Sequence, residues 1–420
     1  MIKHILKIIW NQRRSNGWIF AELLIVVGIL WVMMDSLLVD KYTYYQPLGF
    51  NIDNVYKVQL GVIMPGTSGY VEDSLLTTRQ GEDVLRLVDN IRQEDKVEEV
   101  SLSHVGCVYT ENRSWSTLFR ADADTFIKAG FRQSTVTPEY FTVLRIKEKE
   151  GKDLSTLIGQ RTGIVISADM ERAFYGEKGS ARGQFVKYHP DNSDEMLVLA
   201  VSGSVRESEY KESIPFFYQI PTREQLLGDI EENQPQAVDC LVRMKPGFRA
   251  EDMEALLQGM GDRLTVNNVY VSSVVPLSEM RSQILKSRED NMKKKTALVG
   301  FMLINVFFGI IGTFWLRTQA RQGEMGLRVA LGSNRRQLSR LMNLEGLILL
   351  ALTIPFLLVF IVNMLYFDMP DTYRLPYTWW RFAVTFGGAY LLMAGMITLG
   401  IWFPIRKTMK MKPAEALHYE

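Results

Sequence analysis

The 420-residue sequence has few of the residues and motifs on which enzymes depend. It contains two cysteines and four histidines, and no histidines have the spacing of a metal-binding pair. The phosphate-loop pattern G-x-x-x-x-G-K-[ST] is absent, as are HExxH and G-x-S-x-G. These absences argue against ATP hydrolysis, zinc-dependent hydrolysis and serine hydrolysis by the chain. No cofactor is expected.

A strong excess of charge is also lacking, because the net charge is only +1. This balance does not suggest nucleic-acid binding. The two cysteines, Cys107 and Cys240, both fall between the first and second apolar runs described below. An oxidising compartment would permit a disulfide there, and two buried free thiols fit equally well.

Long apolar runs are what the chain does have. Each is about 20 residues or more, which is enough to cross the hydrocarbon core of a bilayer as a helix. We therefore predict four transmembrane helices, at residues 17–40, 297–316, 341–367 and 382–403. Pro355 should kink the third of these helices.

Basic residues in the short flanks predict the orientation. They are concentrated before the first run, in the connector 317–340 and in the tail 404–420. Both termini and the connector should therefore be cytoplasmic, and residues 41–295 should be periplasmic, in a bacterial inner membrane. No small-x-small cleavage site follows the first run, so we read it as an uncleaved anchor. Residues 1–16 are amphipathic and basic, which is typical of a helix on anionic membrane lipids.

The external segment 41–276 is predicted to be an α+β domain. Two strand-helix-strand patterns bracket it, which fits a split βαβ, ferredoxin-like module with its strands in one sheet. Short strands between them suggest a smaller inserted module at about 137–222. Residues 277–296 contain no Gly or Pro and should form a stalk helix continuous with the second span. The fold class is thus four transmembrane helices, one before and three after a large α+β domain.

Few polar residues interrupt the spans, which argues against a channel or a proton-coupled carrier. Asn305 should form a hydrogen bond across a helix interface, either within the chain or with a second subunit. Glu22 and Glu345 lie near the cytoplasmic boundary, and we expect them to extend toward Arg14 and Arg340 rather than relay protons.

The connector predicts an elbow of two helices at the membrane surface. Gly332 suits the end of the first helix, and Ser333 suits the N-cap of the second. Such an elbow could transmit movement from a cytoplasmic partner to the membrane span that follows it.

The connector also carries a family resemblance. Its RQGEMGLRVALGSNRRQL resembles the R-x-x-E-I-G-x-x-R-A-x-G-A-x-R segment of the macrolide-exporter-type ABC permeases, the superfamily of MacB, LolC/LolE and FtsX. The ending FPIRKTMKMKPAEALHYE is similar to that family's closing segment, and TPEYFTVLRIKEKEGKDLS and CLVRMKPG resemble segments of its external domain. The chain departs from the usual residues at Val329, Ser333, Lys152 and His418.

The resemblance implies a permease that dimerises, with itself or with a paralogous permease, and works with a separate ATPase that binds the ATP. The family uses the connector as a coupling helix, and we carry that role to Glu324, Gly326, Leu327, Arg328, Gly332, Arg335 and Arg336. It further implies mechanotransmission, in which ATP-driven motion of the helices reaches the external domain. We expect export or periplasmic expulsion of an amphiphilic compound or peptide. A periplasmic adaptor and an outer-membrane channel are the further partners that this route would use. The alternatives are a lipoprotein-release permease and an FtsX-like signalling scaffold that activates a cell-wall hydrolase.

Overall fold

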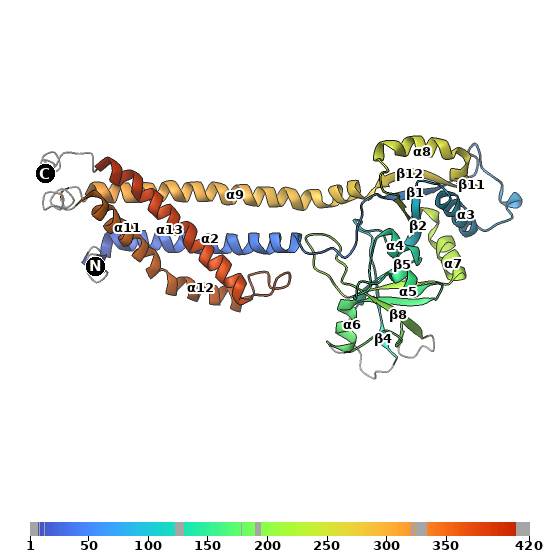
Figure 1. Cartoon of the computed structure of the whole chain (residues 1–420), viewed down its shortest axis with the longest axis horizontal. Helices are drawn as coiled ribbons and strands as arrows, with labels where there is room; N and C mark the ends of the chain where they lie inside the picture. Colours follow the sequence, from blue (N-terminus) through green and yellow to red (C-terminus); the bar gives the residue numbers. More distant parts are fainter. Residues whose placement is uncertain are drawn as a thin grey trace. The chain divides into compact units, whose positions relative to one another are not determined.

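The computed structural model describes residues 7, 9–11, 13–121, 130–177, 179–189, 195–320, 323 and 334–408 (Figure 1). The chain divides into two compact units. We call Gln46–Arg288 the sheet unit, and Met1–Tyr45 together with Glu289–Glu420 the helical unit.

The sheet unit begins and ends with a strand-helix-strand segment. The first consists of β1 (Val55–Val62), α3 (Gln80–Arg92) and β2 (Val97–His104), and the last of β10 (Val238–Met244), α8 (Met253–Met260) and β12 (Val269–Pro276). Their strands lie in the order β12-β1-β10-β2, and each neighbouring pair is antiparallel. This is the split βαβ arrangement that the sequence predicts. The short β11 (Thr265–Val266) pairs with β12 at the edge.

Helical periodicity explains how α3 is fixed on these strands. Its residues Val84, Leu87, Val88 and Ile91 recur three and four positions apart and are all buried. They share one apolar cluster with Met260 of α8 and with side chains from all four strands. The two helices therefore cover the same apolar core.

The middle of the sheet unit continues this sheet. Beyond β2 the order is β5-β9-β6-β8-β7-β4, and β3 pairs with β5. The strands are β3 (Ser114–Thr117), β4 (Phe119–Arg120), β5 (Gly130–Val136), β6 (Gly163–Ser167), β7 (Phe185–Lys187), β8 (Met196–Ser202) and β9 (Phe216–Ile220). The helices are α4 (Glu139–Val143), α5 (Leu154–Ile158), α6 (Ala168–Tyr175) and α7 (Arg223–Asn233), with 3-10 turns at Asp73–Leu75, Pro235–Ala237, Ala250–Asp252 and Gly261–Leu264.

The region 137–222 is therefore less separate than the predicted inserted module. Its β9 pairs in parallel with β5, which itself pairs with β2, so one sheet runs through both parts. Tyr140 and Tyr218 also share a buried cluster with Val55 and Leu241 of β1 and β10. The periodicity identified the strands, but their pairing depends on contacts between distant residues.

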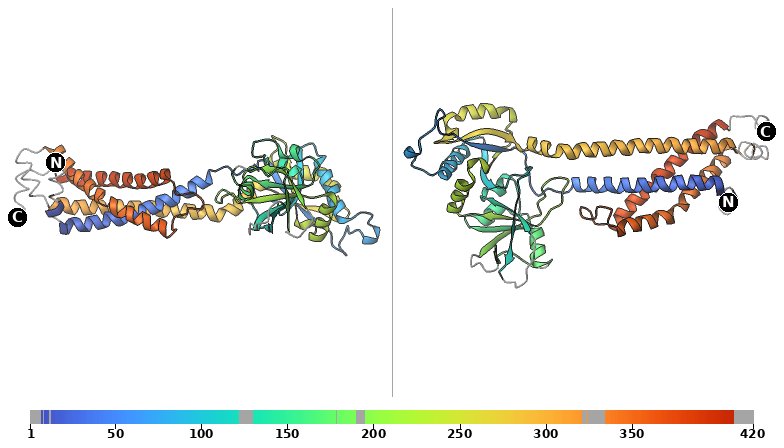
Figure 2. Two further views of the ribbon diagram at one scale, coloured as in Figure 1. Left: turned by 90° about the horizontal axis from the view of Figure 1, so that it is seen from below. Right: turned by 180° about the vertical axis from the view of Figure 1, so that it is seen from behind.

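The helical unit contains α2 (Arg13–Tyr44), α9 from Glu289 onward (the whole helix is Leu277–Ala320), α11 (Arg335–Leu352), α12 (Ile354–Tyr366) and α13 (Trp379–Thr408). Helix α2 packs against α11, α12 and α13 (Figure 2). The buried core includes Leu23, Val27 and Trp31 of α2 with Met393 and Ile397 of α13.

Four helices in the described part of the chain are long and apolar enough to cross a membrane. They are Asn16–Tyr44, Leu277–Leu316, Gln337–Tyr366 and Trp379–Trp402. Helix α9 has 44 residues and no break, so it is about 66 Å long at 1.5 Å per residue. That length exceeds the roughly 30 Å of a hydrocarbon core, as expected if a stalk and a span form one helix.

The third candidate span is broken where the sequence predicts a kink. Helix α11 ends at Leu352, and α12 begins at Ile354 with Pro355 in its first turn. Proline has no N–H to donate to the preceding turn, so the hydrogen-bond ladder is interrupted there. The Thr353 hydroxyl at the break lies 2.6 Å from the Leu350 carbonyl and 2.9 Å from the Tyr390 hydroxyl.

Candidate functional site

Most of the predicted coupling segment lies outside the described residues. This applies to Glu324, Gly326, Leu327, Arg328 and Gly332. Arg335 and Arg336 form the first turn of α11.

The start of α11 corrects the predicted N-cap. Asn334, not Ser333, is the N-cap, and it exchanges two 3.0 Å hydrogen bonds with Gln337 in a capping box. An Asn followed three residues later by Gln satisfies two free N–H groups at once, which fixes the start of the helix.

The predicted intramembrane polar residues have different surroundings. The Asn305 amide is exposed and donates to the Phe301 carbonyl of its own helix (2.8 Å), so within this chain it does not form the expected bond to another helix. Glu22 is half-buried and accepts a hydrogen bond from the Thr313 hydroxyl of α9 (3.2 Å), in place of the expected direction toward Arg14.

Glu345 is almost completely buried, at 3% exposed. Helical packing encloses it, because α11 lies against both α2 and α13. Its expected direction toward Arg340 stays a prediction.

A buried ion pair joins α2 and α13 in the helical unit. The Arg381 guanidinium donates from Nε to Asp35 Oδ1 (2.8 Å) and from Nη2 to Asp35 Oδ2 (2.6 Å). Arg381 is 0% exposed and Asp35 is 5% exposed. Arg381 also donates to the Asp371 and Leu375 carbonyls, and it lies over the Tyr377 ring at 5.1 Å. Such a bidentate pair fixes both the distance and the orientation of the two helices.

A second ion-pair group lies at Asp40, nearer the end of α2. Asp40 accepts hydrogen bonds from Lys295 Nζ of α9 (2.6 Å) and from Arg374 Nη1 (2.8 Å). Lys295 also donates to the Ser36 hydroxyl. Arg374 lies in the segment between α12 and α13 and donates from Nε to Asp371 (2.6 Å). Asp40 thus links three segments that are far apart in the sequence.

The charges in the α12–α13 segment stabilise each other. Partial burial acts to raise the pKa of Asp371, but the hydrogen bonds and positive charge of Arg374 outweigh it, so that pKa lies below its ordinary value. Burial acts to lower the pKa of Arg374, but its hydrogen bonds to Asp371 and Asp40 raise it overall. Both groups are therefore charged at neutral pH.

We call Asp35, Asp40, Lys295, Arg374 and Arg381 the ion-pair network. The sequence did contain a signal for it, namely acids at the end of the first span and bases at the starts of the second and fourth. Taken singly, however, Asp35 indicates only a cost of membrane insertion, and Lys295 indicates only a basic residue beside a span. The pairing itself was not predictable, because Asp35 and Arg381 are 346 residues apart.

Chemistry at a metal or a reactive thiol finds no support in the described residues. Among them, no three His, Cys, Asp or Glu side chains are placed to hold a metal ion. Cys107 and Cys240 are free and buried, and burial raises the pKa of each thiol to about 12. Such thiols are unreactive at neutral pH.

A protein-family model matches part of the helical unit. Residues 296–413 match the family model described as FtsX-like permease C-terminal. No curated protein matches the chain. This match agrees with the family that the connector and tail resemble.

Solved structures similar to the chain include two extracytoplasmic regions. One is the periplasmic region of MacB from Actinobacillus actinomycetemcomitans, with 11% identity, a TM-score of 0.33, and coverage of 57% of this chain and 97% of the other. The other is the extracellular domain of the noncanonic ABC-type transporter YknZ from Gram-positive bacteria, with 15% identity, a TM-score of 0.29, and coverage of 52% and 100%.

Proposed function

Since residues 296–413 form an FtsX-like permease domain, we propose that this chain is the permease subunit of an ABC transporter of the mechanotransmission type. A separate ATPase supplies the energy, and the permease drives export or periplasmic expulsion of an amphiphilic compound or peptide. The family match is the observation that carries this proposal.

The helices support a mechanical role. Helix α9 runs without a break from the end of β12 to Ala320. An unbroken helix resists bending better than a loop, so it is suited to relay movement between a membrane end and an external end.

In this proposal the ion-pair network sets the position of the moving helix. Lys295 ties α9 to Asp40 of α2, and Arg374 ties the α12–α13 segment to the same carboxylate. If α9 moved along α2, the ion pair between Lys295 and Asp40 would either break or move together with α9. The network therefore couples the helix to the rest of the unit.

Docking of the ATPase is assigned to the connector, at Glu324, Gly326, Leu327, Arg328, Gly332, Arg335 and Arg336. Both termini and this connector would be cytoplasmic, and the sheet unit periplasmic. The exposed Asn305 would face a second permease subunit, identical or paralogous, because an exposed amide within a bilayer gains from a polar partner.

Isolation of the intact chain in detergent from its native host tests the proposal. We expect an ATPase to co-purify, and the purified chain alone to lack ATP hydrolysis. An adaptor in the same complex supports efflux, bound lipoproteins support lipoprotein release, and a cell-wall hydrolase supports the scaffold alternative. ATP hydrolysis by the chain alone would contradict the proposal.

A charge reversal tests the docking site. Glu324→Lys should abolish stimulation of the ATPase by the permease, while Glu251→Lys, an exposed acid of the sheet unit, should leave it unchanged. Normal stimulation in Glu324→Lys would remove this residue from the docking site.

A further inference from the structure

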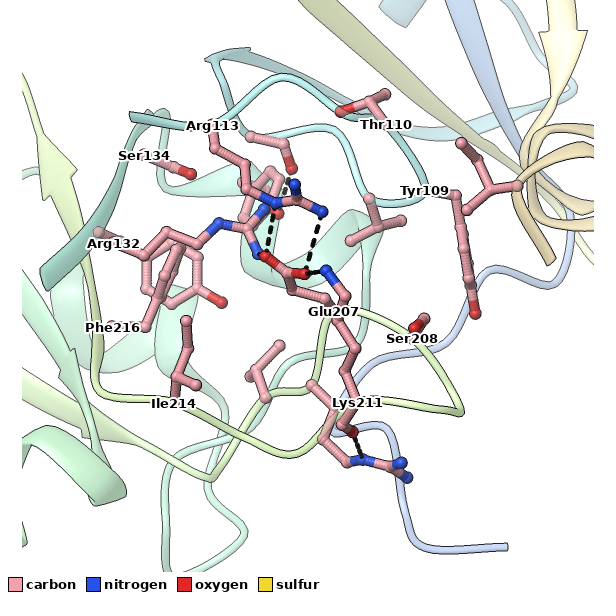
Figure 3. A pocket seen from close by; sticks show the side chains of 17 residues that line it. Tyr109, Thr110, Arg113, Arg132, Ser134, Glu207, Ser208, Lys211, Ile214 and Phe216 are labelled. Atoms are coloured by element: carbon pink, nitrogen blue, oxygen red, sulfur yellow. Dashed lines mark hydrogen bonds and ion pairs between the residues drawn. The ribbon is translucent and has the colours of Figure 1, made fainter. Parts of the chain in front are cut away.

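A basic pocket lies in the sheet unit between β5, β9 and the segment that joins β8 to β9 (Figure 3). Its volume is about 80 Å³, which is larger than the roughly 10–15 Å³ that one water needs. Four basic side chains and one acidic side chain line it, namely Arg113, Arg132, Arg206, Lys211 and Glu207. The lining therefore carries excess positive charge.

Three of these cations share a single carboxylate. Arg113 donates to both Glu207 oxygens, at 2.8 and 3.1 Å, and both Arg132 and Lys211 are also ion-paired with Glu207. Burial acts to raise the pKa of Glu207, but these partners lower it overall, so the carboxylate is ionised at neutral pH. One negative charge leaves the group of three cations only partly compensated.

Arg132 is placed deepest of the three. Its side chain is 13% exposed, and its guanidinium lies over the Phe216 ring at 5.5 Å. The Nε atom is buried and has no hydrogen-bond partner. A buried donor of this kind is unfavourable until an acceptor reaches it.

The segment that carries Glu207 and Lys211 is held in place by its own contacts. Arg206 is buried and donates to the carbonyls of Gln46 (2.8 Å), Glu209 (2.7 Å) and Lys211 (2.7 Å). The basic groups are thus positioned before any ligand arrives, which lowers the entropy lost on binding.

We propose that this pocket binds one oxyanion, a phosphate or carboxylate group, through Arg113, Arg132 and Lys211. Glu207 is the internal anion that occupies the same cations when no ligand is bound. Guanidinium groups suit this ligand because their planar N–H donors match two oxygens at once. The aromatic wall at Phe216 would contact the first carbons attached to the group. The proposal concerns binding by the sheet unit and does not depend on ATP coupling.

Calorimetric titration of the full-length chain in detergent, without ATP, tests this inference. The probes are inorganic phosphate, butyl phosphate and butyrate. Binding of at least one probe, weakened by added salt, is the expected result. Tighter binding of butyl phosphate than of phosphate identifies the oxyanion as an amphiphile's head group, equal binding indicates a free anion, and preference for butyrate indicates a carboxylate. If none of the probes binds, the proposal is wrong.

Two opposed variants separate an oxyanion site from a purely structural cluster. Arg113→Gln removes a charge-assisted donor and should weaken binding by about tenfold or more. Glu207→Gln removes the competing anion and should tighten binding. Loss of a merely structural carboxylate would destabilise the unit without any gain in affinity.

Arg79→Gln is the matched control, because Arg79 forms an exposed ion pair with Glu224 outside the pocket. It should bind like the parent chain. Lys211→Gln provides a second variant if Glu207→Gln fails to fold, and it should also weaken binding. Unchanged affinity in both Arg113→Gln and Lys211→Gln would overturn the proposal.

Discussion

Asp35 and Arg381 form a bidentate ion pair that is almost completely enclosed by the helical unit, with N–O distances of 2.8 and 2.6 Å. Burial of either charged side chain alone would have a large desolvation cost. In the pair, each side chain compensates the charge of the other. The pair joins the first and last candidate spans, so it fixes a contact on which the fold of this unit depends.

Removal of one partner should be much more harmful than removal of both. Arg381→Met leaves the Asp35 carboxylate buried and unpaired, and we expect a loss of about 3–5 kcal/mol in stability. The double variant Asp35→Leu with Arg381→Met should recover most of that loss. Thermal unfolding in detergent of Asp35→Leu, Arg381→Met and the double variant measures the three free-energy changes of a double-mutant cycle. Arg340→Met, an exposed residue of α11, is the control and should change little. Equal losses in the single and double variants would contradict the role assigned to the pair.

Removal of the Lys295 side chain should cost more stability than removal of a nearby exposed lysine. Lys295→Met removes a charge-assisted hydrogen bond to Asp40, which retains Arg374, so we expect a loss of about 1–2 kcal/mol. Lys293→Met removes an exposed lysine whose side chain is 74% exposed and should cost less than about 0.5 kcal/mol. The comparison is made by the same unfolding assay, and indistinguishable values would show that Lys295 does not hold α9 to α2.

Two glycines of the helical unit should respond in opposite directions. A Cβ at Gly346 would lie 2.8 Å from Ile397 and 3.1 Å from Phe314, so Gly346→Ala should destabilise the packing by about 1–3 kcal/mol. A Cβ at Gly395 meets nothing within 4 Å, and Gly395→Ala should be neutral or stabilise α13 by about 0.5–1 kcal/mol. Retained stability in Gly346→Ala would mean that α11 and α13 separate more easily than their packing implies. Among Gly387, Gly388 and Gly395 of α13, only a Cβ at Gly388 would meet another helix, at Met34.

His104 should give the sheet unit a dependence on pH. Its Nδ1 lies 3.1 Å from Asp229, and this hydrogen bond is the largest cause that raises the pKa of His104 above its ordinary value. Since the folded pKa exceeds the unfolded one of about 6.5, the contribution is complete below pH 6.5 and is lost as the pH rises through the folded pKa. We expect His104→Gln to remove this decrease above pH 6.5 in thermal unfolding of the full chain. Asp229→Asn should remove it too, and a parent-like pH profile in both variants would refute the assignment.

Regular patterns made part of the fold predictable. The four helices follow from apolar runs of sufficient length, the break at Pro355 follows from a missing N–H, and the two βαβ segments follow from their periodicity. The direct continuation of the sheet through β5 and β9 could not be predicted from such patterns. Strands of similar composition have many possible partners, and only long-range packing selects among them.

The sequence by itself determined which segments are apolar, which flanks are basic and where the four long apolar helices lie, because these properties depend on neighbouring residues. Tertiary structure alone decided that Asp35 meets Arg381, that Asp40 meets both Lys295 and Arg374, and that Glu207 gathers three cations. An isolated charge in the sequence has only an insertion or solvation cost. Packing removes water and brings distant side chains within hydrogen-bond distance. Only then does a charge acquire its partner, and only then is it decided whether that charge stabilises or destabilises the fold.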